Sequence, residues 1–215
     1  MRDHSLNIRI ENDTTPLEAT LQGGSGGSSR AVLLLHPHPL YGGDMHNDVI
    51  MSMERLFHSL DLLTLKFNFR GAGESGSYVG PYGSVQDVFS AIRFLENDFG
   101  VSEIGVVGYS FGGSIALASA IKQSFDFCIT LSASLQLLNE ACDVKNMSGE
   151  IECPCFLFHG DHDDVVPIDD MYQISKIIGR GSKTFMIEGE GHYYRDSIRT
   201  VCDQSKLFVE IIWDV

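Results

Sequence analysis

Residues 104–118, IGVVGYSFGGSIALA, decide the fold class of this 215-residue chain. The stretch begins with a short apolar run typical of a buried strand, and it ends in small apolar residues suited to a helix that packs on a sheet. Strands that alternate with helices in this way characterise α/β proteins. The segment therefore predicts a strand–turn–helix unit with Ser110 at the turn.

The same pattern recurs along the chain. Continuous apolar runs predict buried strands at 31–35, 62–69, 104–107, 127–131, 155–158 and 184–187, with helices near 45–60, 84–98, 111–123, 168–179 and 195–212. Segments 6–11 and 17–21 alternate with period two, which predicts an antiparallel pair with one exposed face. We expect a single α/β domain over 1–215, with the Gly/Ser-rich stretch 23–29 as a flexible turn between strands. The short segment between 131 and 155 leaves little room for a lid.

Composition narrows the class of protein. Hydrophobic residues make up 43% of the chain and charged residues 20%, values typical of a globular fold. The formal net charge of -14 disfavours nucleic acid and anionic membranes as partners. The first residues lack the apolar core of a signal peptide and no apolar run is long enough to span a bilayer, so we expect a cytoplasmic protein. The five cysteines form neither a CxxC motif nor a zinc spacing.

The candidate nucleophile is Ser110, at the centre of the GxSxG motif formed by Gly108, Ser110 and Gly112. A sharp strand-to-helix turn strains the backbone at the serine and leaves room only for small neighbours. The serine would stand at a helix N-terminus, which favours negative charge.

A serine hydroxyl needs a base and a third group that orients the base. In chains with this turn, the acid and then the histidine follow the serine. Of the downstream histidines, His159, His162 and His192, only His192 lies in a Gly-rich loop directly after the last predicted strand. We therefore expect His192 to be the base.

The acid is one of three aspartates in a single loop, Asp161, Asp163 and Asp164. Here the sequence resembles α/β-hydrolases, because His159, Gly160, Asp163, Val166 and Pro167 match their HGxxDxxVP segment. The resemblance implies that Asp163 is the triad acid, with Asp161 or Asp164 as the alternatives.

Two further stretches carry the resemblance: residues 36–43, HPHPLYGG, and residues 67–76, FNFRGAGESG. They are similar to motifs of a small bacterial subgroup of α/β-hydrolases without a lid, itself similar to dienelactone hydrolases and to the catalytic domains of prolyl peptidases. The matching motifs run from about residue 31 to residue 192. The resemblance implies an eight-stranded, mostly parallel sheet whose second strand is antiparallel. A serine hydrolase of this kind would need no cofactor.

The HPHP turn occupies the place of the first oxyanion loop in that family. Prolines 37 and 39 have no N–H to donate, so the backbone N–H of His38 is the candidate donor, together with that of Phe111. Leu40 and Tyr41 are alternative donors.

Two rival interpretations use the same residues. His36 and His38 suggest a metal site with His159, Asp161 and Asp163, but a rigid turn explains the HPHP pair, so we expect no metal. The spacing of Gly71, Gly73 and Gly76 resembles a dinucleotide-binding fingerprint, which is weak evidence when it stands alone.

These features lead us to expect a serine hydrolase that cleaves a carboxylic ester or related acyl bond of a small-molecule substrate. The alternatives are a binding or regulatory protein with little turnover, and a peptidase or acyltransferase that uses the same triad. Neither the substrate nor the oligomeric state follows from the sequence.

Overall fold

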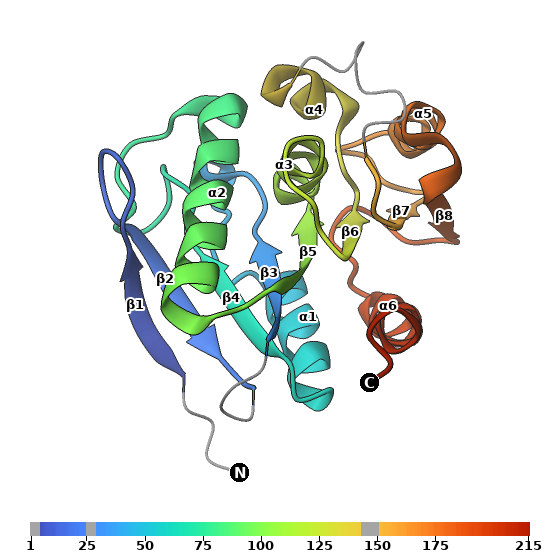
Figure 1. Cartoon of the computed structure of the whole chain (residues 1–215). Helices are drawn as coiled ribbons and strands as arrows, with labels where there is room; N and C mark the ends of the chain where they lie inside the picture. The colour runs from blue at the N-terminus through green and yellow to red at the C-terminus, as the bar shows by residue number, and fades with distance from the viewer. Residues whose placement is uncertain (1–4, 25–28, 143–150) are drawn as a thin grey trace.

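A central eight-stranded sheet organises the protein (Figure 1). The computed structural model describes residues 5–24, 29–142 and 151–215. Along the sheet the strand order is β1-β2-β4-β3-β5-β6-β7-β8. The strands are β1 (Leu6–Ile10), β2 (Leu17–Gln22), β3 (Arg30–Leu35), β4 (Leu63–Phe67), β5 (Glu103–Tyr109), β6 (Phe127–Leu131), β7 (Cys155–Gly160) and β8 (Ser182–Ile187).

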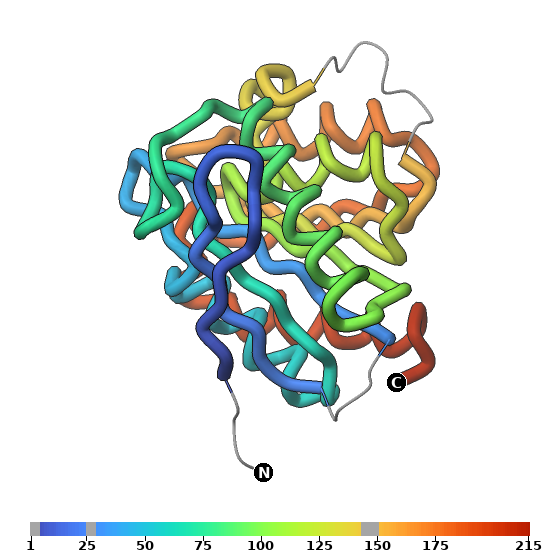
Figure 2. Tube along the Cα trace, turned by 60° about the vertical axis from the view of Figure 1, so that its left-hand side comes forward, coloured from blue at the N-terminus to red at the C-terminus, as the bar shows by residue number. Residues whose placement is uncertain are grey.

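Strand β2 is the antiparallel one. It runs antiparallel to both of its neighbours, β1 and β4, whereas the pairs from β4 to β8 are all parallel. The β1–β2 hairpin forms one edge of the sheet and lies in the foreground of Figure 2. This arrangement confirms the predicted fold, an α/β-hydrolase sheet with an antiparallel second strand.

Helices cover both faces of the sheet. They are α1 (Asp48–Ser59), α2 (Gly80–Phe99), α3 (Phe111–Ala120), α4 (Leu135–Ala141), α5 (Ile168–Ile178) and α6 (Ile198–Trp213). Side chains of a strand point alternately to opposite faces. In β3, Leu33 and Leu35 pack in the core beneath α2, α3, α4 and α5, whereas Val32 and Leu34 pack in the core beneath α1 and α6. Because both of its faces are buried, β3 is continuously apolar over 31–35.

Three details differ from the sequence-based expectations or lie beyond them. Strand β2 is less exposed on its polar face than expected, because Thr20 is only 4% exposed, whereas Glu18 and Gln22 on the same face are partly exposed. Helix α4 was not predicted; its seven residues fall in the short segment between 131 and 155, for which the sequence analysis expected only that it has little room for a lid. Residues 25–28 of the predicted glycine-rich turn lie outside the described residues.

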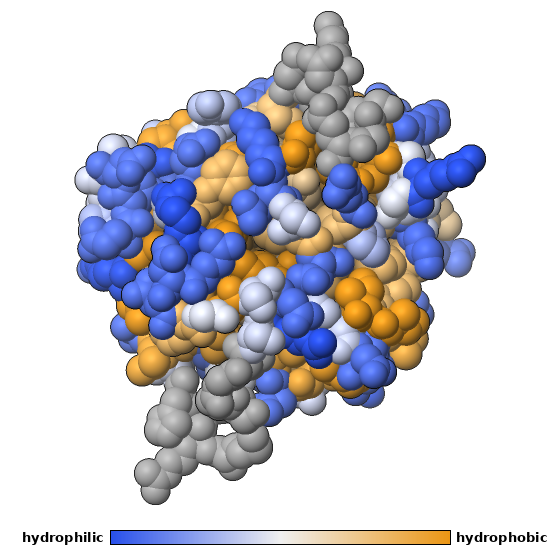
Figure 3. Space-filling model, in the orientation of Figure 1, coloured by the Kyte–Doolittle hydropathy of each residue, from blue (hydrophilic) through white to orange (hydrophobic). Residues whose placement is uncertain are grey.

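The surface over α6 is apolar in part (Figure 3), and Leu207 and Ile211, one helical turn apart, are exposed there. Within the described ranges, no helix has both the length and the hydrophobicity needed to cross a membrane.

Candidate active site

Parallel strands place their carboxyl ends at one edge of the sheet, where an open α/β sheet binds its ligands. Four of these ends supply the candidate site. Ser110 follows β5, His36 and His38 follow β3, Asp163 follows β7, and His192 lies in the loop after β8.

Ser110 stands at a strained turn between β5 and α3. Its φ of 55° and ψ of -115° lie outside the regions that a non-glycine residue ordinarily adopts. The hydroxyl is nearly buried, with 8% of the residue exposed, and the Ser110 N–H donates to the Leu131 carbonyl at 2.7 Å. Strain that the surroundings maintain is typical of a functional residue.

The flanking glycines permit this turn. A Cβ at Gly108 would lie 2.2 Å from the carbonyl oxygen of Gly112. A Cβ at Gly112 would lie 2.1 Å from the carbonyl oxygen of Leu35, at the end of β3. Only glycine therefore lets α3 begin this close to the loop that carries His38.

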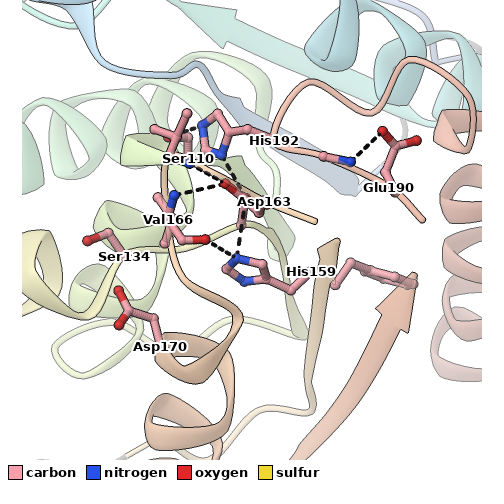
Figure 4. Close-up of polar contacts among 12 residues, drawn as sticks. Ser110, Ser134, His159, Asp163, Val166, Asp170, Glu190 and His192 are labelled. Carbon is pink, nitrogen blue, oxygen red and sulfur yellow. Dashed lines mark hydrogen bonds and ion pairs between the residues drawn. The ribbon is translucent and has the colours of Figure 1, made fainter. Parts of the chain in front are cut away.

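The structure brings Ser110, His192 and Asp163 together (Figure 4). His192 Nε2 lies 3.1 Å from Ser110 Oγ, and His192 Nδ1 lies 2.8 Å from Asp163 Oδ2. A carboxylate oxygen accepts hydrogen bonds, so His192 carries its hydrogen on Nδ1 and leaves Nε2 able to accept from the serine. This is the tautomer that a general base requires.

The Asp163 side chain is buried, and both of its carboxylate oxygens have hydrogen-bond donors. Its Oδ1 accepts from the N–H groups of Val165 at 3.0 Å and Val166 at 2.8 Å. Burial acts to raise the pKa of Asp163, but hydrogen bonds from His159, His192, Val166 and Ser132 outweigh it and hold that pKa well below the usual range. The carboxyl is therefore ionised across the physiological pH range.

The two alternative aspartates lie elsewhere. Asp161 Oδ1 accepts from the Gly189 N–H at 2.7 Å and so joins the ends of β7 and β8. Asp164 is exposed. Neither of these two aspartates is bonded to His192 in the described part of the chain.

The side chains of His38 and Phe111, whose N–H groups are the candidate oxyanion donors, pack against each other with ring centroids 4.7 Å apart. Phe111 is the first residue of α3, so its N–H has no acceptor inside the helix. Among the described residues, neither N–H donates to a backbone acceptor. The Tyr41 N–H donates to the His38 carbonyl and the Leu40 N–H to His38 Nδ1, so both alternative donors are engaged within the turn.

The imidazoles of the HPHP turn have hydrogen-bonding partners. His36 Nε2 accepts from the Phe69 N–H at 2.9 Å, and His36 Nδ1 donates to the Pro37 carbonyl at 2.6 Å. His38 accepts from a backbone N–H at Nδ1, so its hydrogen lies on Nε2, which donates to the Tyr78 hydroxyl oxygen at 3.2 Å. Both side chains thus hold the loop in place.

Glu190 is a site residue that the sequence analysis missed. It is 5% exposed, and it accepts from the N–H groups of Gly191, Asp196 and Ser197 and from the Ser197 hydroxyl. Burial acts to raise its pKa, but these hydrogen bonds lower the pKa overall. Glu190 thereby closes the loop that presents His192. No sequence signal marks it, because a carboxylate beside glycines is ordinary in a loop.

The fold and the position of the site define an α/β-hydrolase. The dienelactone hydrolase family model matches residues 78–192, and the chain belongs to that family. The protein is therefore a hydrolase.

Curated relatives are distant. An uncharacterized protein of Rickettsia prowazekii is 27% identical over 173 residues, which cover 76% of this chain and 71% of the relative. The 2,6-dihydropseudooxynicotine hydrolase of Paenarthrobacter nicotinovorans is 23% identical over 198 residues, and the match covers 73% of this chain and 53% of that protein.

Solved structures show the same fold. An α/β serine hydrolase homologue from Coxiella burnetii superposes with a TM-score of 0.84 at 24% identity, covering 95% of this chain and 97% of the other. An α/β serine hydrolase without lid from Xanthomonas campestris has a TM-score of 0.84 at 18% identity, covering 96% and 94%. Est1E from Butyrivibrio proteoclasticus has a TM-score of 0.83 at 16% identity, covering 97% and 99%.

Proposed function

We propose that this protein is a serine hydrolase that cleaves carboxylic esters through Ser110, His192 and Asp163. The observation that carries the proposal is the pair of hydrogen bonds that link the three side chains, 3.1 Å from Ser110 Oγ to His192 Nε2 and 2.8 Å from His192 Nδ1 to Asp163 Oδ2. These two hydrogen bonds give the weak serine nucleophile its base and fix the orientation of that base.

In the proposed reaction, Ser110 Oγ attacks the ester carbonyl while its proton passes to His192 Nε2. The N–H groups of His38 and Phe111 donate to the oxyanion that forms. Asp163 stays ionised and stabilises the imidazolium. His192 then protonates the departing alcohol, and an acyl group remains on Ser110. Water, deprotonated by His192, releases the carboxylic acid and restores the serine.

Exposed apolar side chains next to the site support esters with an apolar or aromatic group. Leu40 and Tyr41 follow His38, Val165 follows Asp163, and Tyr193 follows His192. The ring of Tyr41 lies 4.9 Å from that of His38, and the ring of Tyr193 lies 5.6 Å from that of His192. Est1E has been solved with ferulic acid, an aromatic carboxylic acid, bound. We therefore infer a small-molecule substrate with an apolar or aromatic group that binds against these side chains.

A fluorophosphonate probe and a p-nitrophenyl acetate assay test the chemistry. We expect wild type to be labelled and to turn over the ester, and Ser110→Ala to do neither. Folded wild type that stays unlabelled contradicts the proposal. Labelling without turnover above the Ser110→Ala background favours a binding protein, and faster cleavage of a p-nitroanilide than of the matching ester favours a peptidase. Acylation of an added alcohol in preference to hydrolysis favours an acyltransferase.

The substrate class needs a separate experiment. We expect Tyr41→Ala and Tyr193→Ala to lower kcat/KM for 1-naphthyl acetate by more than for ethyl acetate, since only the naphthyl ester carries an aromatic group that can pack against these side chains. Leu207→Ala removes an exposed apolar side chain on α6 and should change neither rate. Equal losses for both esters would contradict the aromatic preference.

A further inference from the structure

His159 is a fully buried imidazole beside the triad that the proposed mechanism does not use. It lies near the end of β7, four residues before Asp163. Its Nε2 is 2.9 Å from the Val166 carbonyl oxygen and 3.3 Å from Asp163 Oδ2 (Figure 4). Its Nδ1 is buried and has no hydrogen-bond partner in the part of the chain that the structure describes.

These contacts fix where the hydrogen is. A carbonyl oxygen only accepts, so His159 Nε2 must carry a hydrogen. A hydrogen on Nδ1 would be a buried donor without an acceptor, which is strongly unfavourable. His159 is therefore neutral, and its single N–H lies between the Val166 carbonyl and Asp163 Oδ2.

From this arrangement we infer that His159 is a positioning residue that donates to Asp163 Oδ2 and shares this oxygen with His192. The inference rests on the proposed function. Val165 and Val166 hold Oδ1 while the two imidazoles hold Oδ2, so the carboxylate is fixed in one rotation. When the Asp163 carboxylate accepts a second hydrogen bond, less of its negative charge is available to stabilise a protonated His192. His159 thus limits how strongly Asp163 stabilises the imidazolium of His192.

The other polar groups near His192 and Asp163 are either uncharged or hydrogen-bonded to other partners. The Tyr109 hydroxyl donates to the His192 carbonyl, and the Tyr193 ring lies beside His192. Ser132, which follows β6, also acts to lower the pKa of Asp163. The carboxylate of Glu190 is bound by N–H groups of its own loop, and burial raises the pKa of Tyr194 so that this phenol stays neutral. His159 is therefore the group positioned to moderate the Asp163 charge.

Two variants distinguish the hydrogen bond that His159 donates from the packing of its ring. Phenylalanine at 159 keeps a ring but has no donor, whereas the side-chain amide of glutamine can place an N–H near the position of Nε2. The readout is the pH dependence of kcat/KM for p-nitrophenyl acetate, whose acid limb reports the protonation of the base. We expect His159→Phe to move the acid limb to higher pH by about half a unit and to lower the plateau about tenfold. His159→Gln should keep the wild-type limb.

A folded His159→Phe variant with the wild-type acid limb would overturn the inference, since loss of packing alone lowers the rate equally at every pH. A second readout needs no variant and no turnover. In wild type labelled with ¹⁵N-histidine, the His159 Nε2 resonance should show a bonded hydrogen and Nδ1 none at pH 7. The opposite tautomer, or hydrogens on both nitrogens, also overturns it.

The two proposals fail in different ways. Wild type that the fluorophosphonate does not label overturns the proposed function and with it the role of His159 in that reaction. Labelled, active wild type with the wrong His159 tautomer or an unmoved acid limb overturns only the inference on His159.

Discussion

Ser132 and Tyr194, 62 residues apart in the sequence, are hydrogen-bonded through their side-chain oxygens at 3.0 Å, and both have positive φ, 50° and 51°. Both are buried. The Phe158 carbonyl accepts from the Ser132 N–H at 2.9 Å and from the Tyr194 hydroxyl at 3.2 Å. These bonds join the ends of β6 and β7 to the loop that carries His192.

We predict that Tyr194→Phe lowers the free energy of unfolding by about 1–3 kcal/mol, because the Ser132 hydroxyl loses a buried partner. Ester turnover should fall as well, since the His192 loop loses an anchor. Urea unfolding and p-nitrophenyl acetate kinetics measure the two effects. The exposed Tyr172 gives a matched control, and Tyr172→Phe should leave both unchanged. Wild-type stability in Tyr194→Phe would show that the network does not anchor the loop.

Gly112→Ala should displace the loop bearing His38 from the turn at Ser110. The new Cβ would lie 2.1 Å from the Leu35 carbonyl oxygen and 2.7 Å from that of His36, so the loop bearing His38 must move. We expect kcat to fall about a hundredfold, as it does when one oxyanion donor is lost. Gly181→Ala is the control, because its Cβ would approach nothing closer than 3.6 Å. Near-normal kcat in folded Gly112→Ala would contradict the assignment of this loop.

Stability should depend on pH through His36. Burial, opposed by the hydrogen bond to Pro37, lowers the pKa of His36 from 6.5 to about 4. Between these values the unfolded chain binds more protons than the folded one, so stability is retained above pH 6.5 and is lost as pH falls toward 4. The shift corresponds to about 3 kcal/mol. Urea unfolding at several pH values should show a shallower dependence in His36→Gln than in wild type; parallel curves would refute this role.

Glu190→Gln tests the anchor of the His192 loop. The neutral amide weakens the acceptor that binds the Asp196 and Ser197 N–H groups. We expect a loss of about 1–3 kcal/mol in stability, together with a lower kcat at nearly unchanged KM. Glu188→Gln makes the same charge change at an exposed position of the same segment and should have little effect. If the two variants behave alike, the buried carboxylate is not an anchor.

The strands and most of the helices could be predicted because burial on both faces requires continuous apolar runs, as in Val106 and Val107 of β5. The burial of Thr20 in β2 could not, since the alternating sequence does not show that Met45 lies against it. Helix α4 is too short to give a clear periodic signal.

Of the candidate site, the sequence by itself determined the turn at Ser110, because the glycines at 108 and 112 and the adjoining apolar runs are local features. Resemblance pointed to Asp163, and position in a loop pointed to His192. Only the tertiary structure decided which groups meet at the carboxyl edge of the sheet: the distances within the triad, the sharing of Asp163 by two imidazoles, and the anchoring by Ser132, Tyr194 and Glu190. The physical reason is that backbone preference acts between neighbours in sequence, whereas hydrogen bonds depend on distances that exist only once strands far apart in the chain have packed together.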